Sequence, residues 1–195
     1  PQFMSGTHTL TVALFGLLRA GDTLLAATGR PYDTLEGVIG IGEAGKGCGT
    51  LQEYGIHYDE VPLLPDFTPD YAAIAEHAKT ATVVHIQRSR GYTQRNAFDL
   101  DTIQKVADTA RKANPDVVIF VDNCYGEFTQ IREPLSAGAD VIVAALGESS
   151  EMSGESSSRT NLDLPDVQRS LLEALLKTGK PVVLTLFTGR PLTLT

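Results

Sequence analysis

Three places in this sequence combine residue types that could contact a small charged ligand. Ser5-Gly6-Thr7-His8 opens a stretch with helical apolar spacing. Backbone N–H groups and the dipole at a helix start suit a phosphate, although a serine there is also a common helix cap. Tyr32 stands near a second helix start, and Asp122 ends the apolar run VVIFVDN. Taken alone, the tyrosine is typical of packing and the aspartate of a loop cap.

The segments around these residues alternate between strand and helix patterns. Apolar runs predict strands at 24–28, 57–61, 82–86, 117–121, 141–146 and 181–187. Helical spacing or capping predicts helices at 5–19, 32–44, 50–54 and 70–79, one capped by Asp101 and one that starts at Pro165. Strands separated by helices imply right-handed crossovers and a parallel sheet covered on both faces. The pattern therefore predicts an α/β fold, a three-layer α/β/α sandwich.

Composition and charge exclude several classes of function. The chain has 195 residues, of which 42% are hydrophobic and 21% charged, as in ordinary globular proteins. Its net charge of −8 argues against nucleic acid as a partner, because phosphate neutralisation needs a basic face. No apolar run approaches the roughly 20 residues of a membrane span, and no secretory signal is expected. Cys48 and Cys124 have neither disulfide-framework nor metal-ligand spacing, so we expect a cytoplasmic protein without a metal site.

Taken in order, the same stretches resemble the large domain of the fold-type I pyridoxal-phosphate (PLP) enzymes. The resemblance is greatest to the methionine gamma-lyase-like proteins also called aluminium resistance proteins, and it covers about three quarters of the chain. It implies that Ser5-Gly6-Thr7 holds the PLP phosphate, that Tyr32 stacks on the pyridine ring and that Asp122 pairs with the ring nitrogen. Ala137-Gly138-Ala139-Asp140 then matches the lead into the family's lysine-bearing strand.

The chain departs from this family after that lead. Counted from Gly138, the family's serine position is Ala145 and its Schiff-base lysine position is Glu148. A carboxylate cannot form an imine with an aldehyde, and it would repel the cofactor phosphate. This position therefore argues against native lyase or transaminase activity.

From about Val141 onward the sequence resembles a different family, the flavodoxin-like C-terminal domain of family 3 glycoside hydrolases (β-glucosidases). The resemblance rests on LGE, SGE, the LDLP start, the TGKPVVL strand and the GRPL ending. It implies that Glu151 or Glu155 descends from a general acid/base. Retaining glycoside hydrolysis needs two carboxylates about 5 Å apart, and the nucleophile belongs to a barrel that is not in this sequence. A solvated acidic loop is the favoured interpretation.

The two resemblances meet within the strand at 141–146, which both families contain. We therefore expect one α/β domain over residues 1–195, with a PLP-enzyme-like fragment 1–143 and a β-glucosidase-like fragment 144–195. The expected sheet is flavodoxin-like and mostly parallel, with about six strands in the order 2-1-3-4-5-6. An abrupt change of family inside a strand favours a designed chimeric scaffold that is not an enzyme and takes no cofactor.

Two alternatives stay open. In the first, a vestigial site binds PLP or another phosphate-bearing small molecule weakly and non-covalently; its residues would be Ser5, Gly6, Thr7, Tyr32 and Asp122. In the second, the chain is a PLP-dependent lyase-like enzyme that uses another lysine, with Lys46 in a glycine-rich loop as its candidate. The oligomeric state does not follow from the sequence.

Overall fold

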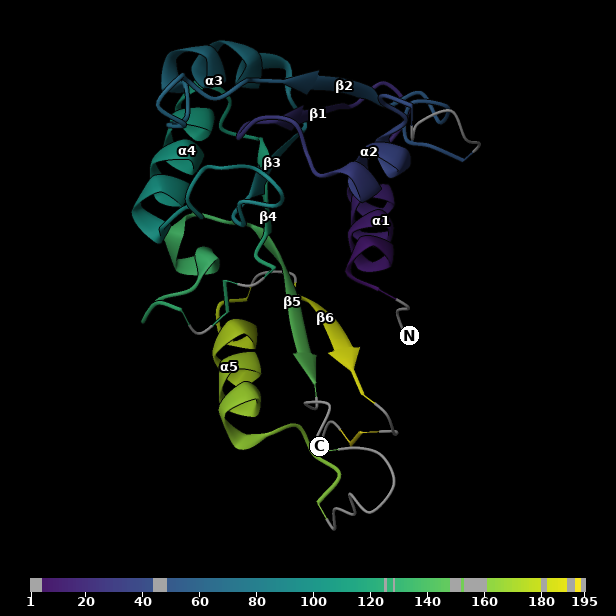
Figure 1. Cartoon of the computed structure of the whole chain (residues 1–195), viewed down its shortest axis with the longest axis vertical. Helices are drawn as coiled ribbons and strands as arrows, with labels where there is room; N and C mark the ends of the chain where they lie inside the picture. The colour runs from purple at the N-terminus through teal and green to yellow at the C-terminus, as the bar shows by residue number, and fades with distance from the viewer. Residues whose placement is uncertain are drawn as a thin grey trace.

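The structure is a computed structural model of the chain, drawn in Figure 1 with its carboxyl-terminal part at the foot. It describes residues 5–43, 49–124, 126–127, 129–147, 152, 161–179, 182–188 and 192–193. Within these ranges, none of the helices has the length and apolar character that a bilayer span requires.

A six-stranded sheet forms the middle layer of the described residues. The strands are β1 Thr23–Ala26, β2 His57–Glu60, β3 Val83–Gln87, β4 Val118–Asp122, β5 Val141–Gly147 and β6 Val182–Phe187. They lie in the order β2-β1-β3-β4-β5-β6, and each neighbouring pair is parallel. The predicted α/β class, parallel sheet and strand order are confirmed.

Helices cover both faces of this sheet (Figure 1). They are α1 Gly6–Leu17, α2 Asp33–Ile39, α3 Tyr71–His77, α4 Leu100–Ala113 and α5 Asp166–Leu176, with short 3-10 turns η1 Ala78–Thr80 and η2 Pro134–Ala137. Two apolar clusters separate the layers: one lies between the sheet and α1 and α2, the other between the sheet and α3, α4 and α5.

Strand β3 shows how side chains divide between the two faces. All five of its residues are buried. Val83 belongs to the cluster on the α1 and α2 side, whereas Val84 and Ile86 belong to the opposite cluster. Since side chains alternate along a strand, His85 and Gln87 face the α1 and α2 side, and they end at the carboxyl edge of the sheet.

Three expectations about the helices are wrong: one end, one whole helix and one cap. The helix expected at 32–44 ends at Ile39, because Gly40 adopts a left-handed conformation (φ 101°) and a Cβ there would lie 2.7 Å from Thr50 Oγ1. Residues 51–55 form turns rather than a helix, because so short a segment gains too few hydrogen bonds to offset the free-energy cost of helix nucleation. The cap of α4 is Asp99, not Asp101: the Thr102 backbone N–H donates to Asp99 Oδ1 at 2.8 Å.

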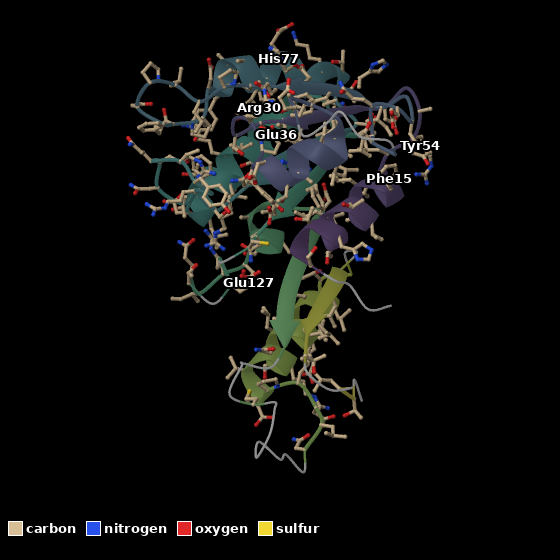
Figure 2. The ribbon with its side chains drawn as sticks, turned by 45° about the vertical axis from the view of Figure 1, so that its right-hand side comes forward. Phe15, Arg30, Glu36, Tyr54, His77 and Glu127 are labelled. Carbon is tan, nitrogen blue, oxygen red and sulfur yellow. The ribbon has the colours of Figure 1, made fainter. Side chains whose placement is uncertain are left out.

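Side-chain contacts brace α1 and α2 from outside, as Figure 2 shows for the labelled pairs. Arg30 Nε donates to Glu36 Oε1 at 2.5 Å, which ties the segment before α2 to its first turn. At the far end of α1, the Phe15 and Tyr54 rings meet edge to face, with centroids 5.4 Å apart. These contacts hold the two helices whose first residues face the carboxyl edge of the sheet.

Candidate functional site

A cavity of about 300 Å³ lies where the carboxyl ends of β3 and β4 meet the starts of α1 and α2. Its lining residues are Gly6, Thr7, Tyr32, Ser89, Gly91, Tyr92, Asp122 and Cys124. The structure thus brings together Gly6, Thr7, Tyr32 and Asp122, which the sequence placed far apart in the chain. Ser5 does not line the cavity. Ligands of open parallel sheets bind at this edge, so the location agrees with the fold.

Ser5 contributes to the cavity indirectly, because it caps the first turn of α1. Its Oγ accepts a hydrogen bond from the His8 backbone N–H at 3.1 Å, and its carbonyl accepts from the Thr9 backbone N–H at 3.2 Å. This cap satisfies one of the four N–H groups that a helix start leaves without an intrahelical partner. Gly6 and Thr7 bring the first turn of α1, with the positive end of its dipole, to the cavity wall.

Tyr32 caps α2 and is tied to the sheet through its backbone. Its N–H donates to Gln87 Oε1 at 3.1 Å. Burial raises the pKa of the Tyr32 phenol, the negative charge of Asp122 raises it further, and the hydroxyls of Thr7 and Thr34 act in the opposite direction. The phenol therefore stays protonated at neutral pH.

Asp122 is a deeply buried carboxylate, with 1% of its surface exposed. Its Oδ1 accepts from the Cys124 backbone N–H at 3.1 Å. Among the described residues it makes no ion pair. Burying a carboxylate without a cationic partner is costly, so the cavity beside it favours a ligand that presents a positively charged N–H.

His85 lies on the same face of the sheet but cannot supply that charge. It is 2% exposed, and burial lowers the pKa of its imidazole, although the nearby Asp122 raises it. Its Nε2 is buried without a hydrogen-bond partner among the described residues. At neutral pH the ring is therefore uncharged, and it packs against Phe120 with ring centroids 5.8 Å apart.

Cys124 forms the wall between the first turn of α1 and Asp122. A Cβ added to Gly6 would lie 4.0 Å from Cys124 Sγ, so the helix start and the loop after β4 approach closely. Burial raises the pKa of the Cys124 thiol, and Asp122 raises it further. The thiol is therefore protonated and a poor nucleophile at neutral pH.

A larger cavity of about 550 Å³ adjoins the first and shares Ser89, Gly91 and Cys124 with it. The Arg88 side chain, 3% exposed, lines this second cavity. It donates hydrogen bonds to the Phe98 carbonyl (3.2 Å), Asn123 Oδ1 (2.7 Å), the Gly126 carbonyl (2.9 Å), Thr129 Oγ1 (3.1 Å) and Gln130 Oε1 (2.9 Å). Because a guanidinium has five N–H donors, Arg88 has none left for a ligand and instead holds the loop after β4 in place.

Arg95 fixes the other loop of the site in a similar way. It is 4% exposed and donates to the carbonyls of Gln87 at 2.8 Å and Asn96 at 2.9 Å, and to that of Ser89. Its guanidinium stacks 4.1 Å from the centroid of the Phe98 ring. Burial lowers the pKa of Arg95 to about 10, so the group stays charged at neutral pH.

Several residues of the sequence argument lie outside the described residues: Lys46, Cys48, Glu148, Glu151 and Glu155. Five residues that line or support the cavity were not predicted as site residues from the sequence: Gln87, Ser89, Gly91, Tyr92 and Cys124. Their position just after β3 and β4 was the available signal, since the carboxyl edge is where such sheets bind ligands. Among the described residues, no group of three or more His, Cys, Asp or Glu side chains could hold a metal ion.

Comparison with known proteins gives a match to the family described as methionine gamma-lyase, over residues 1–151. The uncharacterized protein YnbB of Bacillus subtilis is 44% identical over 147 residues, which are 75% of this chain and 35% of that protein. A candidate cystathionine beta-lyase involved in aluminum resistance, from Listeria monocytogenes, is 45% identical. Its crystal structure superposes with a TM-score of 0.68 over 73% of this chain and 36% of that one. The chain therefore spans about a third of the length of these relatives.

A second, shorter similarity is to the periplasmic beta-glucosidase of Salmonella typhimurium. It is 59% identical over 56 residues, which are 29% of this chain but only 7% of that enzyme. Both resemblances that the sequence suggested are thus present, the second over a short stretch.

The matches overturn three linked expectations. The chain is not a designed scaffold without evolved function, because residues 1–151 match a family of natural proteins and the structural relatives are over 40% identical to it across the aligned part. The expectation that the chain is not an enzyme is wrong because these relatives are named as lyases. The expectation that the chain takes no cofactor is also wrong, since the resemblance to this family implies PLP. These expectations rested on the change of family within the strand at 141–146 and on Glu148, and neither outweighs the match over residues 1–151.

Proposed function

Because the chain belongs to the methionine gamma-lyase family, we propose that it binds PLP in the 300 Å³ cavity and carries the cofactor-binding half of a carbon–sulfur lyase site. The observation that carries this proposal is Asp122, a carboxylate 1% exposed with no ion pair among the described residues. A protonated pyridine nitrogen would supply the missing positive charge. The cavity volume also lies at the lower end of the range typical for small-molecule sites.

The first turn of α1 is the part of the cavity that suits the phosphate. Gly6 and Thr7 line the cavity at a helix start, Ser5 fixes that turn, and no acidic residue lies in it. Backbone N–H groups and the helix dipole favour an anion there. Thr7 Oγ1 also lies 3.0 Å from Thr34 Oγ1, which fixes the position of this hydroxyl at the wall.

Tyr32 suits the ring of the cofactor. The side chain is half-buried at the cavity wall, its backbone is tied to β3, and its phenol stays protonated. An aromatic face held in this way can stack on a pyridine ring and keep it turned toward Asp122.

When bound, PLP acts as an electron sink for the α-carbon of an amino-acid substrate. The part of this chain is to strengthen that property: Asp122 would hold a proton on the ring nitrogen, and burial makes its charge effective there. Tyr32 and Cys124 line the cavity beside Asp122. By sequence count the family's lysine position is Glu148, so the proposal is for non-covalent binding by the described residues.

Calorimetric titration with PLP tests this function. We expect saturable binding that Asp122→Asn weakens about tenfold or more, since a charge-assisted hydrogen bond contributes roughly 1.5–3 kcal/mol. The exposed Asp116→Asn is the matched control and should bind as the unmodified chain does. Absence of binding, or equal binding by the two variants, would refute the proposal.

A further inference from the structure

Gln87 has a buried side-chain amide that links two parts of the cavity wall. It ends β3 and is 6% exposed. Its Oε1 accepts from the Tyr32 backbone N–H at 3.1 Å, and its Nε2 donates to the Ser89 carbonyl at 3.2 Å. Its own backbone N–H donates to Thr28 Oγ1 at 3.1 Å. One side chain therefore connects the start of α2 with the loop after β3.

Gln87 is also the neighbour of Asp122 across the sheet. The two residues pair in the parallel register of β3 and β4. The loop after β3 then turns back over the amide at Gly91, which has φ of +56°. A Cβ at Gly91 would lie 3.1 Å from Gln87 Nε2 and 3.9 Å from Tyr32 Cβ. The Gln87 amide thus lies where two parts of the cavity lining, Tyr32 and Gly91, come close to each other.

An amide satisfies both of its partners without a change of protonation. Tyr32 offers an N–H and Ser89 offers a carbonyl, so the side chain between them must accept at one end and donate at the other. A hydrocarbon would leave the Tyr32 backbone N–H without its acceptor, and it would leave the Ser89 carbonyl with the Arg95 guanidinium but without the amide donor. A carboxylate would set two acceptors against each other at Ser89, and it would add a second negative charge beside Asp122.

We propose that Gln87 is a positioning residue for the cofactor: by holding Tyr32 and the Ser89–Gly91 turn, it sets the angle of the aromatic wall over the ring that Asp122 binds. This inference rests on the proposed function. It differs from that function in that Gln87 does not line the cavity and acts through Tyr32.

The test compares the unmodified chain with Gln87→Met, Gln87→Glu and the control Gln104→Met on α4. PLP is titrated in each, and both the dissociation constant and the induced circular dichroism of bound PLP at saturation are measured. Gln87→Met keeps the length of the side chain but neither hydrogen bond. We expect its affinity to fall about tenfold and its induced signal at saturation to change, because the aromatic wall turns relative to the ring. A residue with a merely structural role would lower the population of folded protein without altering the signal per bound PLP.

Gln87→Glu adds a test within one variant. A protonated glutamic acid has one donor and one acceptor and so imitates the amide, whereas the ionised form does not. The ratio of its affinity to that of the unmodified chain should therefore be low at pH 8 and recover as the pH falls to about 5.5, since burial and Asp122 raise the pKa of such a group. Gln87→Met should show no recovery.

The outcomes separate the two proposals. If the unmodified chain does not bind PLP, the proposed function fails. If it binds and Gln87→Met matches it in affinity and induced signal, the role of Gln87 is refuted while the function stands. A Gln87→Glu ratio that does not change with pH refutes it as well, even if Gln87→Met does not fold.

Discussion

The middle of the sheet, β3 and β4, and its edge, β5 and β6, are built differently. In β3 and β4 nearly every residue is buried. The polar side chains at their carboxyl ends, such as Gln87 and Asn123, make hydrogen bonds to neighbouring loops and side chains. β5 pairs with β4 from Val141 to Val143, yet with β6 from Ile142 to Gly147. Figure 1 accordingly shows β5, β6 and α5 extending beyond the rest of the sheet. Among the residues whose burial is described, the buried charged, amide and imidazole side chains gather in β3, β4 and the loops that follow them, and that region contains the cavity.

The family match ends close to this boundary, after β5, and α5 beyond it has exposed apolar side chains. The match to methionine gamma-lyase covers residues 1–151, and the similarity to the beta-glucosidase is a short one. On and just before α5, Leu162, Val167 and Leu176 are 41%, 69% and 59% exposed. We propose that both regions form one domain joined through the β4–β5 pairing. The contrast teaches that the site depends on the packing of β3 and β4, with β5 and β6 as an extension of the sheet.

The largest effect is expected from the core beneath the site. Phe120→Ala should lower the free energy of unfolding by about 3–5 kcal/mol, because the ring is 0% exposed and its removal leaves a cavity. Leu176→Ala, at a 59% exposed position of α5, should change it by less than about 0.5 kcal/mol. Denaturant unfolding measures both. Equal losses would break the distinction between the two regions.

Arg88→Met should have the next largest effect, a loss of about 3 kcal/mol. The change leaves the buried Asn123 Oδ1 without its Arg88 donor and removes one of the donors to the Gly126 carbonyl, which Thr129 also contacts. Arg88→Lys should restore little of the loss, since an ammonium has three donors and lacks the planar fork. Full recovery by lysine in denaturant unfolding would show that only the charge matters.

Asp122→Asn should stabilise the protein in the absence of PLP, by about 1 kcal/mol. The substitution removes a buried charge that has no cationic partner among the described residues, and the amide oxygen still accepts from Cys124 N. Thermal unfolding without PLP shows whether the substitution raises or lowers the stability. A fall in the melting temperature would mean that the carboxylate is already compensated, and the argument for a cationic ligand would lose its basis.

A smaller effect is expected from His85 through pH. Because burial lowers the pKa of the folded imidazole, the unfolded chain binds more protons below its own pKa of about 6.5. The contribution of His85 to stability is therefore fully present above pH 6.5 and is lost as the pH falls, at up to about 1.4 kcal/mol per pH unit. His85→Gln should flatten the dependence between pH 6.5 and 5, whereas exposed His57→Gln should not. Urea unfolding at several pH values compares the two slopes.

Much of the fold could be predicted from the residues, and less of the site. Continuous apolar runs such as 117–121, separated by helical segments, are typical of buried parallel strands, so the sheet could be predicted. The strand order followed from the two family resemblances. Gly6, Thr7, Tyr32 and Asp122 were placed together by the family pattern and by the rule that parallel strands end at one edge. Gln87 could not be singled out, because its role arises from where Tyr32 and Ser89 meet in space.

Amide chemical shifts, followed by NMR as PLP is added, test the central claim most directly. If the cavity holds the cofactor, saturable shifts should concentrate at the backbone N–H groups of Gly6, Thr7, Tyr32 and Cys124, while those of α5 stay unchanged. Shifts confined to α5 and β6, or none at saturating PLP, would contradict the account.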